Sequence, residues 1–96
     1  MIDPQELSKG KEVYWARIIP SYDYFVALPL KVHTIESDYF TGTEEMSKMT
    51  FLFSYKTDKV FLDKLTCQNY VNDVRDKYYE THKKRTPTKD TSDEYE

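Results

Sequence analysis

The chain has 96 residues, which is enough for one domain, and 16% of them are aromatic. Its net charge is −3, from 14 Lys and Arg against 17 Asp and Glu, whereas duplex-binding domains generally carry a positive balance. Cys67 is the single cysteine, which excludes an intramolecular disulfide and a zinc site built on cysteines.

The first third of the chain predicts one helical turn and two long strands. Asp3 is suited to cap a turn that starts at Pro4 and ends near Leu7. Residues 12–19 alternate as a strand does, with one face made of Val13, Trp15, Arg17 and Ile19 and the other of Tyr14, Ala16 and Ile18. A second strand is expected over residues 24–34. It contains Pro29, which cannot donate to a ladder and therefore predicts a bulge, an edge or a bend.

Three shorter strands and one helix are expected after these. The strands cover residues 39–42, 49–55 and 60–62, and the middle one alternates strictly, with Phe51 and Phe53 on one face. From residue 63 or 66 the apolar period changes to 3.6, which predicts an amphipathic helix with Thr66 as its N-cap. Its apolar stripe is expected to face the core and consists of Cys67, Tyr70, Val71, Val74 and Tyr78. Asp73 and Lys77 are spaced for an i,i+4 ion pair.

These elements together predict an α+β domain, mostly β, over residues 1–80. We expect a small five-stranded antiparallel β-barrel-like sheet followed by one C-terminal amphipathic helix. Residues 81–96 consist almost entirely of polar and charged side chains, so we expect a disordered tail there. Which face of the sheet the helix covers stays open at this point.

Residues that could support catalysis are scarce. His33 is a lone histidine within a strand, and Cys67 has no neighbouring base in the sequence. Gly10 and Gly42 are isolated, so there is no phosphate-binding loop. We therefore predict that the protein is not an enzyme and that it has no metal and no cofactor.

The sequence also bears on location. The N-terminal residues have neither a basic segment nor an apolar run, which argues against a signal peptide. No apolar stretch approaches the roughly 20 residues of a membrane span. We expect a soluble, cytoplasmic protein without a membrane partner.

The aromatic residues provide the candidate binding site, because they outnumber the positions inside so small a domain. Exposed Tyr, Trp and Arg are typical of protein-binding hot spots and of stacking platforms for single-stranded bases. The predicted binding residues are Tyr14, Trp15, Arg17, Tyr22, Tyr24 and Lys31. The alternative is that these rings fill a core that is short of aliphatic residues.

Residues 9–18, KGKEVYWARI, resemble the opening of small β-barrels of the KOW and Tudor type. The stretch from residue 9 to 80 resembles short uncharacterised bacteriophage and prophage proteins, through LKVHTI (30–35), YFTG (39–42), FLFSY (51–55) and VFLDK (60–64). The resemblance implies a phage-encoded inhibitor or modulator of a host protein, such as a defence protein, that acts by stoichiometric binding in the host cytoplasm. A nucleic-acid-binding module is the alternative. Self-association through the same surface or through the edge at residues 60–62 is a further option.

Overall fold

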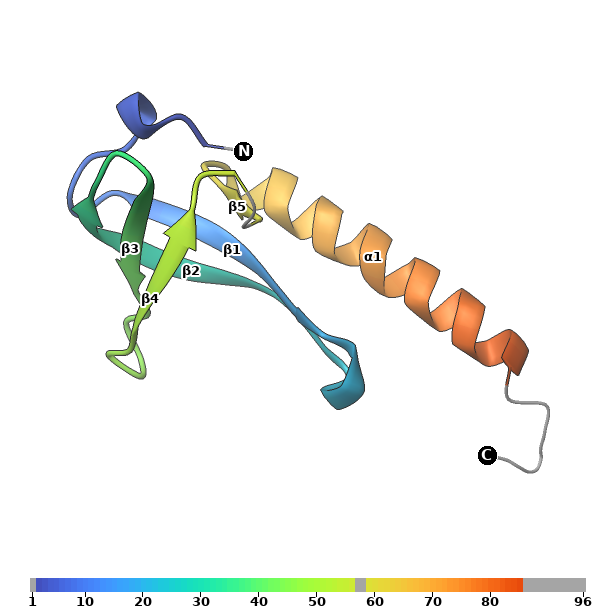
Figure 1. Cartoon of the computed structure of the whole chain (residues 1–96). Helices are drawn as coiled ribbons and strands as arrows, with labels where there is room; N and C mark the ends of the chain where they lie inside the picture. The colour runs from blue at the N-terminus through green and yellow to red at the C-terminus, as the bar shows by residue number, and fades with distance from the viewer. Residues whose placement is uncertain (1, 57–58, 86–96) are drawn as a thin grey trace.

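The computed structural model describes residues 2–56 and 59–85. Its elements are η1 (Pro4–Glu6), β1 (Glu12–Ile19), η2 (Pro20–Tyr22), β2 (Tyr24–Ile35), β3 (Tyr39–Thr43), β4 (Thr50–Ser54), β5 (Val60–Phe61) and α1 (Lys64–Arg85). The strands form one antiparallel sheet in the order β4-β3-β2-β1-β5, followed by the single helix (Figure 1). This confirms the predicted fold class, although the sheet is not closed, and β4 and β5 are its edges.

The longest feature of the sheet is the β1–β2 hairpin, which reaches beyond β3 and β4 (Figure 1). β1 and β2 pair without a break from Glu12 opposite Lys31 to Ile19 opposite Tyr24. β3 pairs with β2 only from Lys31 onward, so the far half of the hairpin has no third strand on that side. The hairpin turns through η2 and Asp23, whose φ of 54° is left-handed and is tolerated by a short polar side chain.

Pro29 lies in β2 two residues before Lys31, opposite Tyr14. β2 has no partner on its other side there, because pairing with β3 begins at Lys31. Pro29 therefore occupies an edge, which is one of the three settings that the sequence predicted. The irregularity in β2 lies farther along, between Val32 and Thr34.

The core divides into two clusters because successive strand residues point to opposite faces of the sheet. On one face Val13, Leu30, Phe40 and Phe53 are buried, together with residues of the N-terminal segment. On the other face Ala16 packs with Cys67 and Val71 of α1. The helix thus covers the Ala16 face of β1 and β2. Figure 1 shows it running along the same side of the molecule as the β1–β2 hairpin.

The predicted helix is present; its first residue lies between the two predicted starting points, residues 63 and 66, and its end comes later than expected. It starts at Lys64, and Asp63 rather than Thr66 caps it: the Asp63 carboxylate accepts hydrogen bonds from the Thr66 backbone N–H (2.8 Å) and hydroxyl (2.9 Å). Hydrogen bonding to the Thr66 N–H and hydroxyl lowers the pKa of Asp63. α1 continues to Arg85, so the predicted tail boundary at residue 81 falls within it, and residues 86–96 lie outside the described part of the chain.

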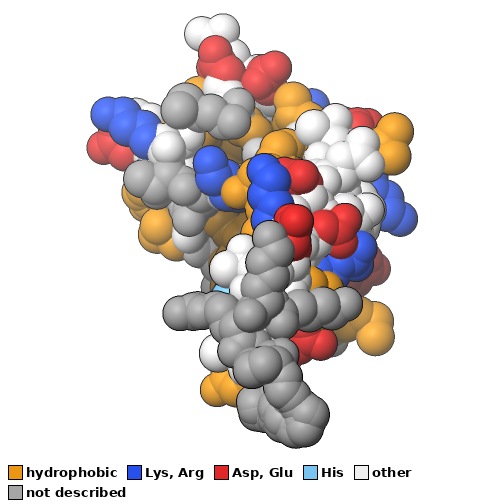
Figure 2. Space-filling view, turned by 90° about the vertical axis from the view of Figure 1, so that its right-hand side faces the viewer, with side chains coloured by type: hydrophobic (Ala, Val, Ile, Leu, Met, Phe, Trp, Pro, Cys, Tyr) orange, Lys and Arg blue, Asp and Glu red, His pale blue; other side chains and the backbone are white. Residues whose placement is uncertain are grey.

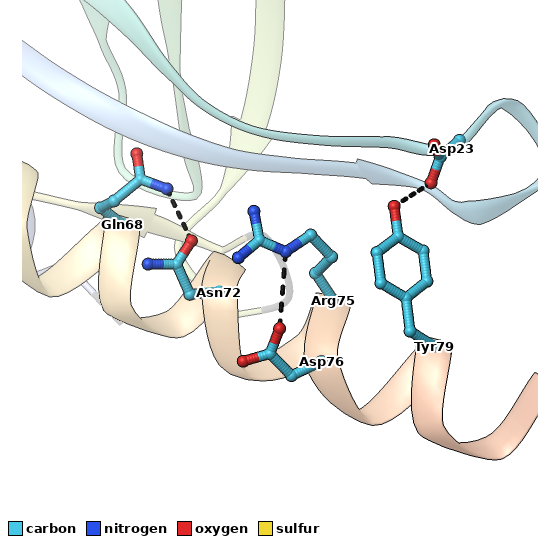
Figure 3. A network of polar contacts seen from close by, with 6 residues as sticks. All are labelled: Asp23, Gln68, Asn72, Arg75, Asp76 and Tyr79. Atoms are coloured by element: carbon cyan, nitrogen blue, oxygen red, sulfur yellow. Dashed lines mark hydrogen bonds and ion pairs between the residues drawn. The ribbon is translucent and has the colours of Figure 1, made fainter. Parts of the chain in front are cut away.

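The apolar stripe of α1 is confirmed, since Cys67 and Val71 are fully buried. The expected ion pair is also present, with Lys77 Nζ lying 3.1 Å from an Asp73 carboxylate oxygen. Near the end of α1, the Tyr79 hydroxyl donates a hydrogen bond to Asp23 at the hairpin tip (Figure 3). This contact attaches the hairpin to the helix at the end far from β5.

Candidate interaction surface

The face of the hairpin opposite α1 carries an arginine that lies over three aromatic rings. The guanidinium carbon of Arg17 is 5.2 Å from the ring centroid of Trp15, 5.7 Å from that of Tyr24 and 5.5 Å from that of Phe51. Three strands supply these residues, since Trp15 and Arg17 come from β1, Tyr24 from β2 and Phe51 from β4. We call Trp15, Arg17, Tyr24 and Phe51 the Arg17 cluster.

The rings of the cluster are held by the core beneath them. The Trp15 ring lies 5.1 Å from Phe51 and 4.9 Å, edge to face, from the buried Phe53. Aromatic pairs at such spacing add about 0.5–1.5 kcal/mol each beyond area burial. All four cluster residues are half-buried, so each leaves part of its side chain at the surface.

Arg17 has no counter-charge in the described part of the chain. None of the carboxylates of residues 2–56 and 59–85 forms an ion pair with it, because the ion pairs there are Arg75–Asp76 and Lys77–Asp73, both on α1 (Figure 3 shows the first). Cation–π contacts contribute roughly 0.5–1 kcal/mol each at exposed sites. The aromatic rings therefore position the cation, and its N–H donors have no acidic partner among the residues that the structure describes.

The structure brings together three of the six predicted binding residues: Trp15, Arg17 and Tyr24. Tyr22 lies in η2, two residues before Tyr24, and is 79% exposed at the hairpin tip. Tyr14 points to the opposite face, against the helix-side core, where desolvation and the nearby Glu12 raise its pKa. Lys31 lies at the other end of the hairpin, opposite Glu12 and Thr43.

Phe51 belongs to the cluster although it was not among the predicted binding residues. Its alternation with Phe53 placed it on the apolar face of β4, which correctly indicates its side of the sheet. Its contact with Arg17 arises because the curved sheet brings β4 over β1, as the Trp15–Phe51 distance of 5.1 Å shows. The alternation of apolar residues in the sequence does not predict that curvature of the sheet.

The groups that could support catalysis lie apart from this surface. Cys67 is fully buried in the helix-side core, and desolvation raises the pKa of its thiol to about 11. His33 lines an open groove of about 320 Å³ with Glu45, Lys31 and Lys48. Within residues 2–56 and 59–85, His, Cys, Asp and Glu form no group of three that could hold a metal ion.

Charge elsewhere on the described surface is mixed. Figure 2 looks onto the side of the molecule toward which α1 runs, and acidic and basic side chains are intermixed there. Arg17 is the only cation of its cluster, in a chain whose net charge is −3. No helix of the described residues has the length and apolar character to cross a membrane.

The resemblance to KOW, Tudor and phage proteins stays a prediction. Comparisons with protein-family models, with curated proteins and with solved structures found no match to this chain.

Proposed function

We propose that this protein is a non-enzymatic interaction module that binds a partner protein stoichiometrically through the Arg17 cluster. The observation that carries the proposal is an arginine that pairs with no carboxylate of residues 2–56 and 59–85, held over three aromatic rings on the hairpin face that α1 leaves uncovered. Trp, Tyr and Arg are the residues most enriched at binding hot spots. Tyr22, at the tip of the same hairpin, forms the rim of this surface.

Preorganisation favours this use of the cluster. Trp15 is fixed between Phe51 and Phe53, and Arg17 rests on rings instead of extending into water. Side chains that are already ordered lose less conformational entropy when a partner binds. A partner carboxylate that met Arg17 would form a charge-assisted hydrogen bond in a partly desolvated setting.

The biological setting is a proposal that rests on the predicted phage resemblance. In that setting the partner is a host protein, such as a defence protein, and binding inhibits or modulates it in the host cytoplasm. A small domain that acts by occupying a surface needs no reaction centre. Cys67 lies in the core on the opposite face of the sheet from the cluster.

One observation favours the alternative, a module that binds single-stranded nucleic acid. Tyr22 is 79% exposed in η2, two residues before Tyr24 of the cluster, and exposed tyrosines can stack on bases. Phosphate contacts supply most of the affinity of such modules, yet the cluster contains one cation. We therefore rank this function below protein binding.

The test is affinity capture from a bacterial lysate with the wild type, an Arg17→Met variant and a Lys31→Met variant. Methionine keeps the aliphatic volume of either side chain and removes the charge, and Lys31 provides the control because it lies away from the cluster. We expect a discrete protein that is retained after nuclease treatment, is lost with Arg17→Met and is kept with Lys31→Met. Capture of nucleic acid alone, abolished by salt, would overturn the proposal in favour of the alternative.

A further inference from the structure

β4 is an unprotected sheet edge. It has five residues, against two in β5, and its sequence TFLFS contains no charge and no proline. Its pairing with β3 is regular over all five positions, from Tyr39 opposite Ser54 to Thr43 opposite Thr50. Natural edge strands usually carry a charge, a proline or a bulge that prevents pairing with other chains. β4 has none of these.

The polar groups on the free side of this edge follow from the ladder. The Glu44 N–H donates to the Met49 carbonyl at 2.9 Å, which fixes the side to which each residue of β4 points. Backbone groups of successive residues point alternately to the two sides of a strand. Phe51 and Phe53 therefore bond to β3, and the N–H and C=O groups of Thr50 and Leu52 point away from it. The Leu52 side chain is 64% exposed.

The free edge also adjoins the Arg17 cluster. Phe51 belongs to both, because its ring on the inner face of β4 lies 5.1 Å from Trp15 and 5.5 Å from the Arg17 guanidinium carbon. A strand laid alongside β4 would continue the sheet over this cluster. Its inward side chains would then meet Trp15 and Arg17, while its outward side chains would lie beside Leu52.

Charge distinguishes between the possible occupants of the edge. Lys48 and Lys56 flank β4, are exposed, and form no ion pair with any carboxylate in residues 2–56 and 59–85. If two copies paired antiparallel over all five residues, Leu52 would face Leu52, and the Lys48 end of each β4 would lie near the Lys56 end of the other. Like charges in opposite positions destabilise a strand pair. An acidic strand from another protein would instead be attracted to both ends and to Arg17.

We infer that β4 accepts an extended acidic segment of a partner protein as a sixth strand. Main-chain hydrogen bonds to Thr50 and Leu52 provide the pairing, and side chains at alternate positions provide the selection. One inward carboxylate binds Arg17, and outward carboxylates lie near Lys48 and Lys56. The inference deepens the proposed function, on which it rests for the Arg17 contact, whereas the edge pairing is argued independently.

The test uses a capped synthetic heptapeptide of sequence EVTETVE, whose alternation places V, E and V on one face and E, T, T and E on the other. It is titrated into isotope-labelled full-length protein, and amide shifts and hydrogen exchange are measured by NMR. We expect the amides of Thr50 and Leu52 to shift and to gain protection. The amides of Phe51 and Phe53 gain little protection, since they already bond to β3. Absence of these changes at millimolar peptide would overturn the inference.

Two control peptides separate main-chain pairing from side-chain attraction. N-methylation of alternate residues removes the N–H donors on one side of the peptide, and there are two such peptides, one for each side. Only the peptide that lacks the donors facing β4 should fail to bind. A peptide with lysine in place of each glutamate should bind at least tenfold more weakly, because it meets Arg17, Lys48 and Lys56 with like charge. Equal binding of both N-methylated peptides would show that no strand is added.

Variants of the protein complete the test. Leu52→Pro removes an outward N–H and leaves the hydrogen bonds between β3 and β4 intact. The variant should therefore fold but no longer bind the peptide. Arg17→Met should weaken peptide binding roughly tenfold, and binding to this variant should still depend on which residues of the peptide are N-methylated. If β4 stays unaffected by peptide while Arg17-dependent lysate capture persists, strand addition fails and the proposed function stands. If Leu52→Pro abolishes peptide binding and Arg17→Met has no effect on lysate capture, the proposed function is wrong and the inference of strand addition at β4 is retained. Changes at Thr50 and Leu52 that depend on protein concentration without peptide would identify a second copy and overturn the inference.

Discussion

Tyr79 and Asp23, separated by 56 positions in the sequence, are joined by a hydrogen bond from the Tyr79 hydroxyl to an Asp23 carboxylate oxygen (Figure 3). The Phe25 ring lies beside the same contact, 5.6 Å from the ring of Tyr78 and 5.8 Å from that of Tyr79. The last turns of α1 therefore hold the tip of the hairpin whose opposite face carries the Arg17 cluster. Without this contact, each strand at the tip of the hairpin would pair only with the other, and both faces of the tip would be exposed to water.

Tyr79→Phe removes this hydrogen bond and keeps the ring on Phe25. We expect faster amide exchange over residues 22–25 and unchanged exchange at Val71 in the core. The hydrogen bond to Asp23 raises the pKa of Tyr79, so folding favours the protonated phenol. The contact is therefore fully present below the ordinary tyrosine pKa of about 10 and is lost as pH rises through the raised value.

Hydrogen exchange at the hairpin tip, measured as the pH rises through the raised pKa of Tyr79, tests whether the contact is lost on ionisation. The wild type should lose protection at the tip as Tyr79 ionises, while Tyr79→Phe should show little further change. Tyr39→Phe, on the exposed surface of β3, is the matched control and should behave as the wild type. Equal exchange in all three proteins would show that the contact does not hold the hairpin.

Adjacent positions in β4 provide a test of its register. Phe53 is buried between Phe40 and Trp15, whereas Leu52 is 64% exposed on the other face. Phe53→Ala should reduce the free energy of unfolding by about 3–5 kcal/mol, through lost burial and the cavity left behind. A domain this small has a total stability of about 5 kcal/mol, so the variant should be largely unfolded. Leu52→Ala should change stability by less than about 0.5 kcal/mol in chemical denaturation, and similar losses for both would contradict the register.

Cys67 should be unreactive in the folded protein. Its side chain is fully buried against Ala16 and Val71, and desolvation raises the thiol pKa to about 11, so little thiolate exists near neutral pH. We expect a disulfide reagent to label native protein far more slowly than protein unfolded in guanidinium chloride. Labelling of native protein at the rate of the unfolded chain would place Cys67 outside the core.

The elements could be predicted from the sequence where their signals are local. β1 was predicted with its observed bounds because alternation is a property of the strand itself. The stripe through Cys67 and Val71 likewise follows from the helical period. The helix cap was placed at Thr66 because a hydroxyl residue there precedes the stripe, but the Asp63 carboxylate accepts both the backbone N–H and the hydroxyl of Thr66. The cap is therefore the stronger acceptor three residues upstream, Asp63, in place of Thr66.

The candidate site was only partly predictable, because it depends on which face the helix covers. Alternation places Tyr14 and Trp15 on opposite faces, yet both faces of β1 are apolar, so either could have been the open one. The packing of Ala16 against α1 decides that Tyr14 is covered and Trp15 is not. Phe51 reaches the cluster through the curvature of the sheet, which arises from long-range contacts such as Trp15 with Phe53. Such contacts leave no periodic signal in the sequence.

The arrangement of the Arg17 cluster can be tested with the chain's own fluorescence, because Trp15 is its single tryptophan. Arg17→Ala removes the cation from the Trp15, Tyr24 and Phe51 rings, so the indole should become more accessible to water. We expect emission at longer wavelength, stronger quenching by acrylamide, and a loss of about 1–2 kcal/mol in the free energy of unfolding from the three contacts together. Lys31→Ala, at the far end of the hairpin, is the control and should leave emission unchanged and stability within about 0.5 kcal/mol. If Arg17→Ala and Lys31→Ala quench alike, Arg17 does not cover Trp15 in solution, and the surface proposed for partner binding lacks its central cation.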